Sequence, residues 1–345
     1  MDNRIATFRK GVRLNTRKIF GENEMKSIRL TLILLLIPLM LNAGVKLSNL
    51  PADLNTQNGK VIFEGIKKIN GLDIYCKVIG SGEPLLIVHG GPGLSHEYLF
   101  HPFNTLADNY KLIFYDQRGC GKSQAFNIGD TTTINTMVED LEALRKEFLL
   151  DKLNLVGQSW GAVISLNYTL KYPANVKKLL LLEPAPGSGE YLDQIQKMIV
   201  KRLTEDQMKK LSQISQSPEL RTNSELFKEF MNIRMKTYYY DTTFAEDKKF
   251  DYFDNEMVTK FFASSAKFGP YLLNFNLYEQ MKYISCPTLI IHGDYDVIPN
   301  ESIERMAKEI KNSELHIIKK CGHFVHIEKP EEYFSTIISF LQKNE

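Results

Sequence analysis

The chain has 345 residues, 43% hydrophobic and 24% charged, which is enough apolar sequence for one large folded domain or two modest ones. An intrinsically disordered chain is therefore excluded. Its formal net charge is +2, with eight basic and three acidic residues in residues 1–43 and 35 basic against 38 acidic residues in the remainder. This balance gives no basic surface for nucleic acid, so we expect no nucleic-acid partner.

A basic segment followed by a short apolar run opens the chain. The run from Leu30 to Leu41 contains Pro38 and would span only about 18 Å as a helix, against roughly 30 Å of membrane hydrocarbon. The pattern is typical of a secretory signal cleaved after Ala43; an uncleaved anchor is the alternative, and Met25 is an alternative start. We expect residues 1–43 to be a signal peptide or anchor, residues 44–60 to be a linker, and the protein to be exported. Membrane contact is expected only if the segment stays uncleaved.

Three strands are predicted at the start of the folded region. Residues 61–69 and 72–78 alternate in polarity and are joined by Asn70-Gly71, the strongest short-range hairpin signal. Residues 84–89 form a continuous apolar run, which is typical of a strand buried on both faces. This run leads into His89-Gly90-Gly91-Pro92-Gly93, whose glycines allow the backbone to approach a ligand closely.

A further buried strand, residues 111–115, leads into residues 116–123, which read Asp-Gln-Arg-Gly-Cys-Gly-Lys-Ser. The end of this run imitates a phosphate-binding loop, but that motif needs glycine where Asp116 stands, so nucleotide binding is rejected. We interpret the run as a structural turn in which Asp116 and Arg118 fix the loop near the active site.

Neither a metal site nor a disulfide is predicted. His96-Glu97 is followed by His101 at a spacing that misses the zinc-binding H-E-x-x-H pattern by one residue. The cysteines form no C-x-x-C pair and are interpreted as small buried hydrophobic residues rather than bridges. There are four of them: Cys76, Cys120, Cys286 and Cys321.

The run Leu153 to Gly161 contains Gly157-Gln158-Ser159-Trp160-Gly161, a G-x-S-x-G pattern. A strand-like stretch precedes it and a helix-compatible stretch follows, which is the context of a nucleophile elbow. Such a turn presents the Ser159 hydroxyl clear of the sheet, with the Trp160 N–H facing the space where an oxyanion forms. In hydrolases with this elbow a glycine-rich loop gives the second donor. We therefore assign the oxyanion hole to the backbone N–H groups of Gly91 and Trp160.

The rest of the chain divides into two patterns. Residues 184–283 are helix-compatible and rich in aromatic residues, and we interpret them as a helical cap over the mouth of the active site. Strands alternating with helices indicate parallel βαβ topology; these elements are expected at residues 133–149, 176–182, 287–292, 302–311, 314–318 and 331–341. The prediction is an α/β fold with a mostly parallel central sheet flanked by helices, built from residues 61–183 and 284–345.

A serine nucleophile needs a histidine base that a carboxylate orients. In this architecture the chain order is serine, acid, histidine. The candidates for the acid are Asp294 and Asp296, and three histidines follow them: His316, His323 and His326. His323 is favoured because it lies in a glycine-marked loop, and His326 is the alternative. Asp296 is favoured as the acid, because Asp294 is expected to hold the turn at the end of the preceding strand. The predicted catalytic group is thus Ser159, His323 and Asp296.

These motifs resemble those of the α/β-hydrolase superfamily, and residues 61 to 341 are similar to its proline iminopeptidase (prolyl aminopeptidase) group. The resemblance is carried by three motifs at residues 89–93, 116–123 and 157–161, with Asp296 and Gly322-His323 behind them. It implies a serine hydrolase with an acyl-enzyme mechanism and no metal or organic cofactor. The expected substrate is a small peptide that loses its N-terminal residue. A carboxylesterase or other small-acyl hydrolase with the same machinery is the alternative.

The resemblance also implies that acidic residues bind the amino terminus of the substrate. Relatives that bind a free amino terminus use acids in or beside the cap, and some place Glu directly after the catalytic Asp, where this chain has Val297. A buried ammonium group needs a carboxylate partner. Glu225 and Glu229 would share one face if residues 225–240 form a helix, so we predict that they bind the substrate. A solvated charged face is the alternative interpretation.

Overall fold

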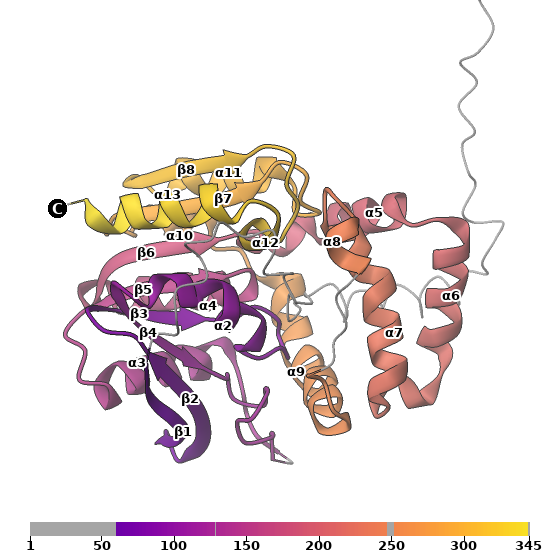
Figure 1. The fold of residues 1–345 in the computed structure, drawn as a ribbon, viewed down its shortest axis with the longest axis horizontal. Helices are drawn as coiled ribbons and strands as arrows, with labels where there is room; N and C mark the ends of the chain where they lie inside the picture. The colour runs from indigo at the N-terminus through magenta and orange to yellow at the C-terminus, as the bar shows by residue number, and fades with distance from the viewer. Residues whose placement is uncertain (1–59, 128, 247–251, 344–345) are drawn as a thin grey trace, which may run out of the picture.

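Figure 1 shows the protein as a computed structural model, which describes residues 60–127, 129–246 and 252–343. The predicted signal segment, and all of the predicted linker except its last residue, lie outside the described residues.

Eight strands form a single sheet in the order β1-β2-β4-β3-β5-β6-β7-β8. The pairs β1–β2 and β2–β4 are antiparallel, and every other neighbouring pair is parallel. This confirms the predicted mostly parallel α/β sheet. The strands are β1 (Val61–Ile69), β2 (Leu72–Ile79), β3 (Glu83–Val88), β4 (Tyr110–Tyr115), β5 (Leu153–Gln158), β6 (Val176–Leu182), β7 (Thr288–Gly293) and β8 (Ser313–Ile318).

The strand order reverses at β3, which lies between β4 and β5. In open parallel sheets, ligands bind outside the carboxyl ends of the strands at such a reversal. The glycine-rich loop follows β3 and Ser159 follows β5. The fold therefore brings both predicted oxyanion segments to the point where a substrate site is expected.

Helices connect the strands, and those of the core cover the sheet. The helix α4 is buried along most of its length and packs on β5, because its sequence is apolar on nearly every side. The helix α2, which the sequence did not predict, packs on α13 through Phe103 against Tyr333 and Phe334. The core helices are α2 (Glu97–Phe103), α3 (Ile134–Glu147), α4 (Trp160–Lys171), α11 (Asn300–Glu309), α12 (Val325–Glu328) and α13 (Pro330–Gln342).

The helices α5 to α9 and the short helix α10 (Tyr278–Met281) lie between β6 and β7 in the chain, and we call residues 184–283 the inserted segment. Figure 1 shows α5 to α9 gathered on one side of the sheet, with α6 and α7 farthest from the strands. They are α5 (Leu192–Arg202), α6 (Glu205–Gln216), α7 (Ser224–Met235), α8 (Thr243–Glu246) and α9 (Asn255–Asn274), with 3₁₀ turns that include η8 (Lys236–Tyr238).

The inserted segment contacts the core through α9. A Cβ on Gly93, in the loop after β3, would lie only 2.7 Å from Cα of Phe261 in α9. The glycine loop therefore passes directly beneath this helix. The four cysteines are all free and buried, in agreement with their interpretation as small hydrophobic residues.

Candidate active site

Ser159 occupies a strained turn between β5 and α4. Its φ is +51° and its ψ is −115°, a backbone conformation that is costly for a residue with a side chain. The chain must pass close to its neighbours to make this turn: a Cβ on Gly161 would lie 2.1 Å from the carbonyl oxygen of Val88 in β3. A Cβ on Gly157 would lie 2.5 Å from Oγ of Ser165. Any side chain at either glycine of the motif would therefore clash with neighbouring atoms.

Ser159, His323 and Asp296 are brought together by loops after three different strands. His323 Nε2 lies 3.2 Å from Ser159 Oγ, and His323 Nδ1 lies 2.6 Å from Asp296 Oδ2. A carboxylate can only accept, so Nδ1 carries the hydrogen and Nε2 is left to accept the serine O–H. All three side chains are buried. The arrangement is that of a nucleophile, a base and an acid that orients the base.

Asp296 is held in its charged form. Burial alone would raise the pKa of its carboxyl group, but the charge and hydrogen bond of His323 bring that pKa below its ordinary value. The N–H of Ile298 adds a hydrogen bond to Oδ1 at 3.0 Å. Nearby His292 is buried, and burial lowers its pKa, so it stays neutral beside Asp296. Asp296 is therefore a fixed anion behind His323.

The other candidates considered from the sequence lie elsewhere. Asp294 accepts a long hydrogen bond from the N–H of Cys321 at 3.4 Å and does not contact His323. His316 is about half exposed on β8, beside Glu314. His326 is buried among the rings of Tyr98, Phe324 and Tyr333.

The two segments predicted to supply oxyanion donors lie next to Ser159. Gly90 is so near that a Cβ on it would be 3.3 Å from Cβ of Ser159, and its N–H donates to the Tyr98 hydroxyl at 2.5 Å. Gly91 follows it with a φ of +132°. Trp160 is the first residue of α4, and the first N–H groups of a helix have no partner within that helix.

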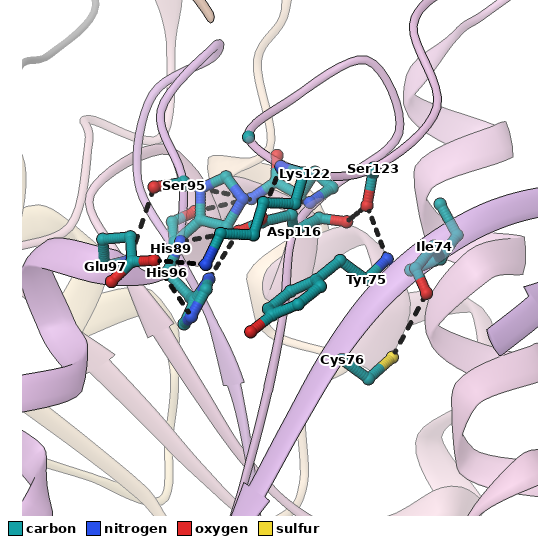
Figure 2. Close-up of polar contacts among 12 residues, drawn as sticks. Ile74, Tyr75, Cys76, His89, Ser95, His96, Glu97, Asp116, Lys122 and Ser123 are labelled. Atoms are coloured by element: carbon teal, nitrogen blue, oxygen red, sulfur yellow. Dashed lines mark hydrogen bonds and ion pairs between the residues drawn. The ribbon is translucent and has the colours of Figure 1, made fainter. Parts of the chain in front are cut away.

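Asp116 organises the loop after β4. Figure 2 shows it surrounded by His96, Lys122 and Ser123. Its carboxylate accepts from the N–H and Nδ1 of His96, at 2.8 and 2.7 Å, and from the N–H of Lys122 at 2.8 Å. Burial alone would raise the pKa of Asp116, but these contacts with His96 bring it down to about 2. Arg118 instead pairs with Asp140 of α3 at 2.6 Å.

Glu225 and Glu229 do not lie where the sequence analysis predicted. Both are on the outer face of α7, where Glu225 pairs with Lys228 at 2.8 Å and Glu229 with Lys210 at 3.0 Å. The Glu225 side chain is 82% exposed. The helix turns its apolar residues inward instead, which leaves these acids facing solvent. The structure therefore does not bring either carboxylate to Ser159.

A largely apolar cavity opens beside Ser159. The inserted segment, which the sequence analysis predicts to lie over the mouth of the active site, contributes most of the cavity wall. The sequence did not show which of its residues face the cavity, because apolar residues in an amphipathic helix look alike whether they face a core or a cavity. Among the described residues that line the cavity, none is acidic or basic apart from His323. They are Ser159, Trp160, Ala185, Pro186, Leu192, Ile195, Tyr238, Leu272, Phe275, Val297, Ile298 and His323.

Within the described ranges no three or more His, Cys, Asp or Glu residues are close enough together to hold a metal ion.

The fold and the site define a class. The chain belongs to the α/β-hydrolase fold family, whose model matches residues 83–330. It is a hydrolase that resembles proline iminopeptidases: it is 32% identical to the proline iminopeptidase of Heyndrickxia coagulans over 272 residues, 76% of this chain and 91% of that protein.

Solved structures of other proteins share the fold. The proline iminopeptidase of Mycobacterium smegmatis matches with a TM-score of 0.61 and 19% identity over 82% of this chain and 97% of that one. The esterase EaEST from Exiguobacterium antarcticum matches with a TM-score of 0.58 and 23% identity over 81% of this chain and all of that one. At these identities the likeness concerns the fold alone.

The prediction that the protein is exported is wrong. The curated relatives are proline iminopeptidases, which are typically cytoplasmic enzymes. The segment on which the prediction was based, residues 1–43, lies outside the described residues. In the part of the chain that the structure covers, no helix has the length and apolar character needed to span a membrane.

Proposed function

We propose that the protein is a serine hydrolase that releases N-terminal residues, proline among them, from small peptides through an acyl-enzyme intermediate. The observation that carries this proposal is the unbroken chain of contacts from Ser159 through His323 to Asp296, at 3.2 and 2.6 Å. The similarity to proline iminopeptidases over nearly their full length supports the choice of substrate.

In the proposed mechanism Ser159 Oγ attacks the carbonyl carbon of the scissile bond while its proton passes to His323 Nε2. Asp296 stabilises the imidazolium that forms. The carbonyl oxygen becomes an oxyanion, which the N–H groups of Gly91 and Trp160 stabilise. His323 then gives its proton to the leaving amine, and water, activated by the same base, hydrolyses the acyl-enzyme.

The apolar cavity suits the acyl side of such a substrate. Its wall of aliphatic and aromatic side chains, including Leu192, Ile195 and Phe275, would bury the ring of a prolyl residue. Burial of apolar area contributes roughly 25 cal/mol per Å². We therefore expect a preference for a compact apolar N-terminal residue over a charged one.

A comparison of Ser159→Ala with the wild-type protein tests the mechanism. The variant should keep its fold, because the substituted side chain is smaller, and should lose turnover of a prolyl arylamide by on the order of 10⁶. Wild-type turnover by the purified variant would contradict the assignment of Ser159. Circular dichroism serves as the folding control.

A second candidate function is hydrolysis of uncharged acyl esters. It is favoured by the absence of any carboxylate among the described residues that line the cavity, because a buried ammonium without a counter-charge is costly. Turnover of a free prolyl arylamide and of its N-acetyl form by the wild-type protein separates the two. A strong preference for the free amine supports the aminopeptidase, and equal or better turnover of the acetylated form supports the esterase-like hydrolase.

A further inference from the structure

One buried amide connects the two segments that carry the proposed oxyanion donors. Gln117 directly follows Asp116 after β4 and has no solvent exposure. Its side-chain oxygen accepts from the indole Nε1 of Trp160 at 3.1 Å, and its side-chain nitrogen donates to the carbonyl oxygen of His89 at 2.6 Å. An indole N–H can only donate and a carbonyl can only accept, so these two partners fix the orientation of the amide.

The imidazole ring of His89 also contacts Gln117. The backbone N–H of Gln117 donates to His89 Nε2 at 3.0 Å. An imidazole nitrogen accepts only when it carries no hydrogen, so the hydrogen is on Nδ1, which donates to the carbonyl oxygen of Gly90 at 2.7 Å. Burial lowers the pKa of His89 to about 4, so the imidazole is neutral and can accept near neutral pH.

We propose that Gln117 is a positioning residue for the oxyanion hole. It joins Trp160, whose backbone N–H is one proposed donor, to His89, which lies two residues before Gly91, the other. It acts through these neighbours and does not line the cavity. This inference rests on the proposed function. Hydrogen bonds to an oxyanion depend steeply on donor position, and loss of one such donor costs roughly 10²- to 10³-fold in turnover.

The contacts around Trp160 support this role. The indole packs against the rings of Phe268 and Tyr271 in α9, at 5.1 and 6.3 Å between centroids. Its indole N–H donates to the side-chain oxygen of Gln117, which belongs to the loop after β4. Trp160 is thus held between the inserted segment and Gln117, and removing the amide releases one side of the residue that carries the donor.

Two substitutions separate the functions of the amide. Gln117→Met has a similar size but neither donates nor accepts with its end group. Gln117→Glu can still accept from Trp160 but places a carboxylate oxygen against the His89 carbonyl. We expect each to lower kcat by roughly 10- to 100-fold, less than the loss of a donor, while KM changes by less than about threefold, because the ground state makes little use of the oxyanion hole.

Gln124→Met is the matched control. Gln124 lies in the same loop, and its side-chain oxygen accepts from the N–H of Asp73 at 3.1 Å, far along the chain from the oxyanion segments. The substitution also removes an amide hydrogen bond and should leave kcat within about twofold of wild type. Trp160→Phe removes the other partner of the Gln117 contact, and it tests the same bond if Gln117→Met fails to fold.

The assay uses p-nitrophenyl acetate, whose turnover does not depend on recognition of an amino terminus, and inhibition by phenylboronic acid, which forms a tetrahedral adduct on the serine. The proposal predicts that kcat and boronate affinity fall together in Gln117→Met and Trp160→Phe. It predicts further that the double variant Gln117→Met with Trp160→Phe loses little more kcat and boronate affinity than Gln117→Met alone, because both substitutions remove the same hydrogen bond. Wild-type kcat in the folded Gln117 variants, an effect on KM only, or an equal loss in Gln124→Met would overturn it. Activity in Ser159→Ala would instead reject the proposed mechanism itself.

Discussion

The backbone N–H of His323 donates a hydrogen bond to the carbonyl oxygen of Tyr238 at 2.8 Å. Tyr238 belongs to the inserted segment, and its ring lies 5.5 Å from the imidazole. The inserted segment is therefore joined directly to the loop that carries the proposed base. A change in the packing of these helices should therefore move His323 as well as the residues of the cavity wall.

Glu328 strengthens this junction, and its substitution should weaken it. Its carboxylate accepts from the N–H of Gly322 at 2.7 Å and from the N–H groups of Tyr240 and Asp241 at 3.0 Å. In Glu328→Gln one oxygen becomes a donor, so at least one of these three N–H groups loses its partner. We expect the free energy of unfolding to fall by about 1–3 kcal/mol, measured by urea denaturation. Glu304→Gln, at an exposed position on α11, is the control and should change stability by less than about 0.5 kcal/mol.

Asp296→Asn should lower kcat by about 10⁴-fold while leaving the fold intact, as the corresponding change does in serine proteases. The amide cannot accept from Nδ1 in the same geometry, so His323 adopts the wrong tautomer. Asp294→Asn is the matched control two residues away, because its carboxylate does not contact His323. Steady-state kinetics with circular dichroism checks both. Equal losses in the two variants would contradict the choice of Asp296.

Glu183→Gln should change how stability depends on pH. Glu183 follows β6, is fully buried and accepts from Gln158 Nε2 at 3.3 Å. Burial raises its pKa well above the ordinary 4.5. Between 4.5 and that raised pKa, the unfolded chain has lost a proton that the folded protein keeps, so stability falls as pH rises, by at most about 1.4 kcal/mol per pH unit.

A glutamine at position 183 stays neutral in both states and removes this slope. The variant should therefore gain stability relative to wild type at about pH 8 and differ little at about pH 4.5. Urea denaturation at the two pH values measures the difference, with Glu304→Gln again as the control. A wild-type slope that the variant fully retains would mean that Glu183 is ionised in the folded protein.

Removal of both outer acids of α7 should have little effect. In Glu225→Gln combined with Glu229→Gln, two solvent-exposed ion pairs are lost, and such pairs contribute about 0–1 kcal/mol each. We expect kcat/KM for a free prolyl arylamide to stay within about twofold of wild type. A selective loss of turnover for substrates with a free amine, with esters unaffected, would show that these acids bind the amino group of the substrate.

The sequence was sufficient for the features that depend on short stretches of chain. The strand, elbow and helix around Ser159 follow from glycines and periodicity that lie within twenty residues. The order of Ser159, Asp296 and His323 along the chain selected three residues that the structure brings together. Each residue was chosen because it follows the end of a strand. In a parallel sheet the carboxyl ends of the strands lie at the same edge, so residues that follow them lie close together.

Side chains whose partners are distant backbone groups could not be predicted in this way. Gln117 and Glu328 contact N–H and carbonyl groups, which every residue has, so no pattern of residue types reveals them. The spacing of Glu225 and Glu229 showed that they share a face of a helix, but not which face. The apolar residues of α7, Phe227 and Phe230 among them, decide that by packing inward.

Ser159 and His323 are 164 positions apart, and the loop that carries His323 follows the last strand of the sheet. During synthesis the serine therefore leaves the ribosome long before its base does. According to the proposed mechanism, a nascent chain that has already formed the elbow cannot hydrolyse substrate until β8 joins the edge of the sheet, because Ser159 has no base before then. Premature stops or C-terminal trimming before residue 323 should abolish turnover, so turnover reports a chain that extends beyond β8 and includes His323.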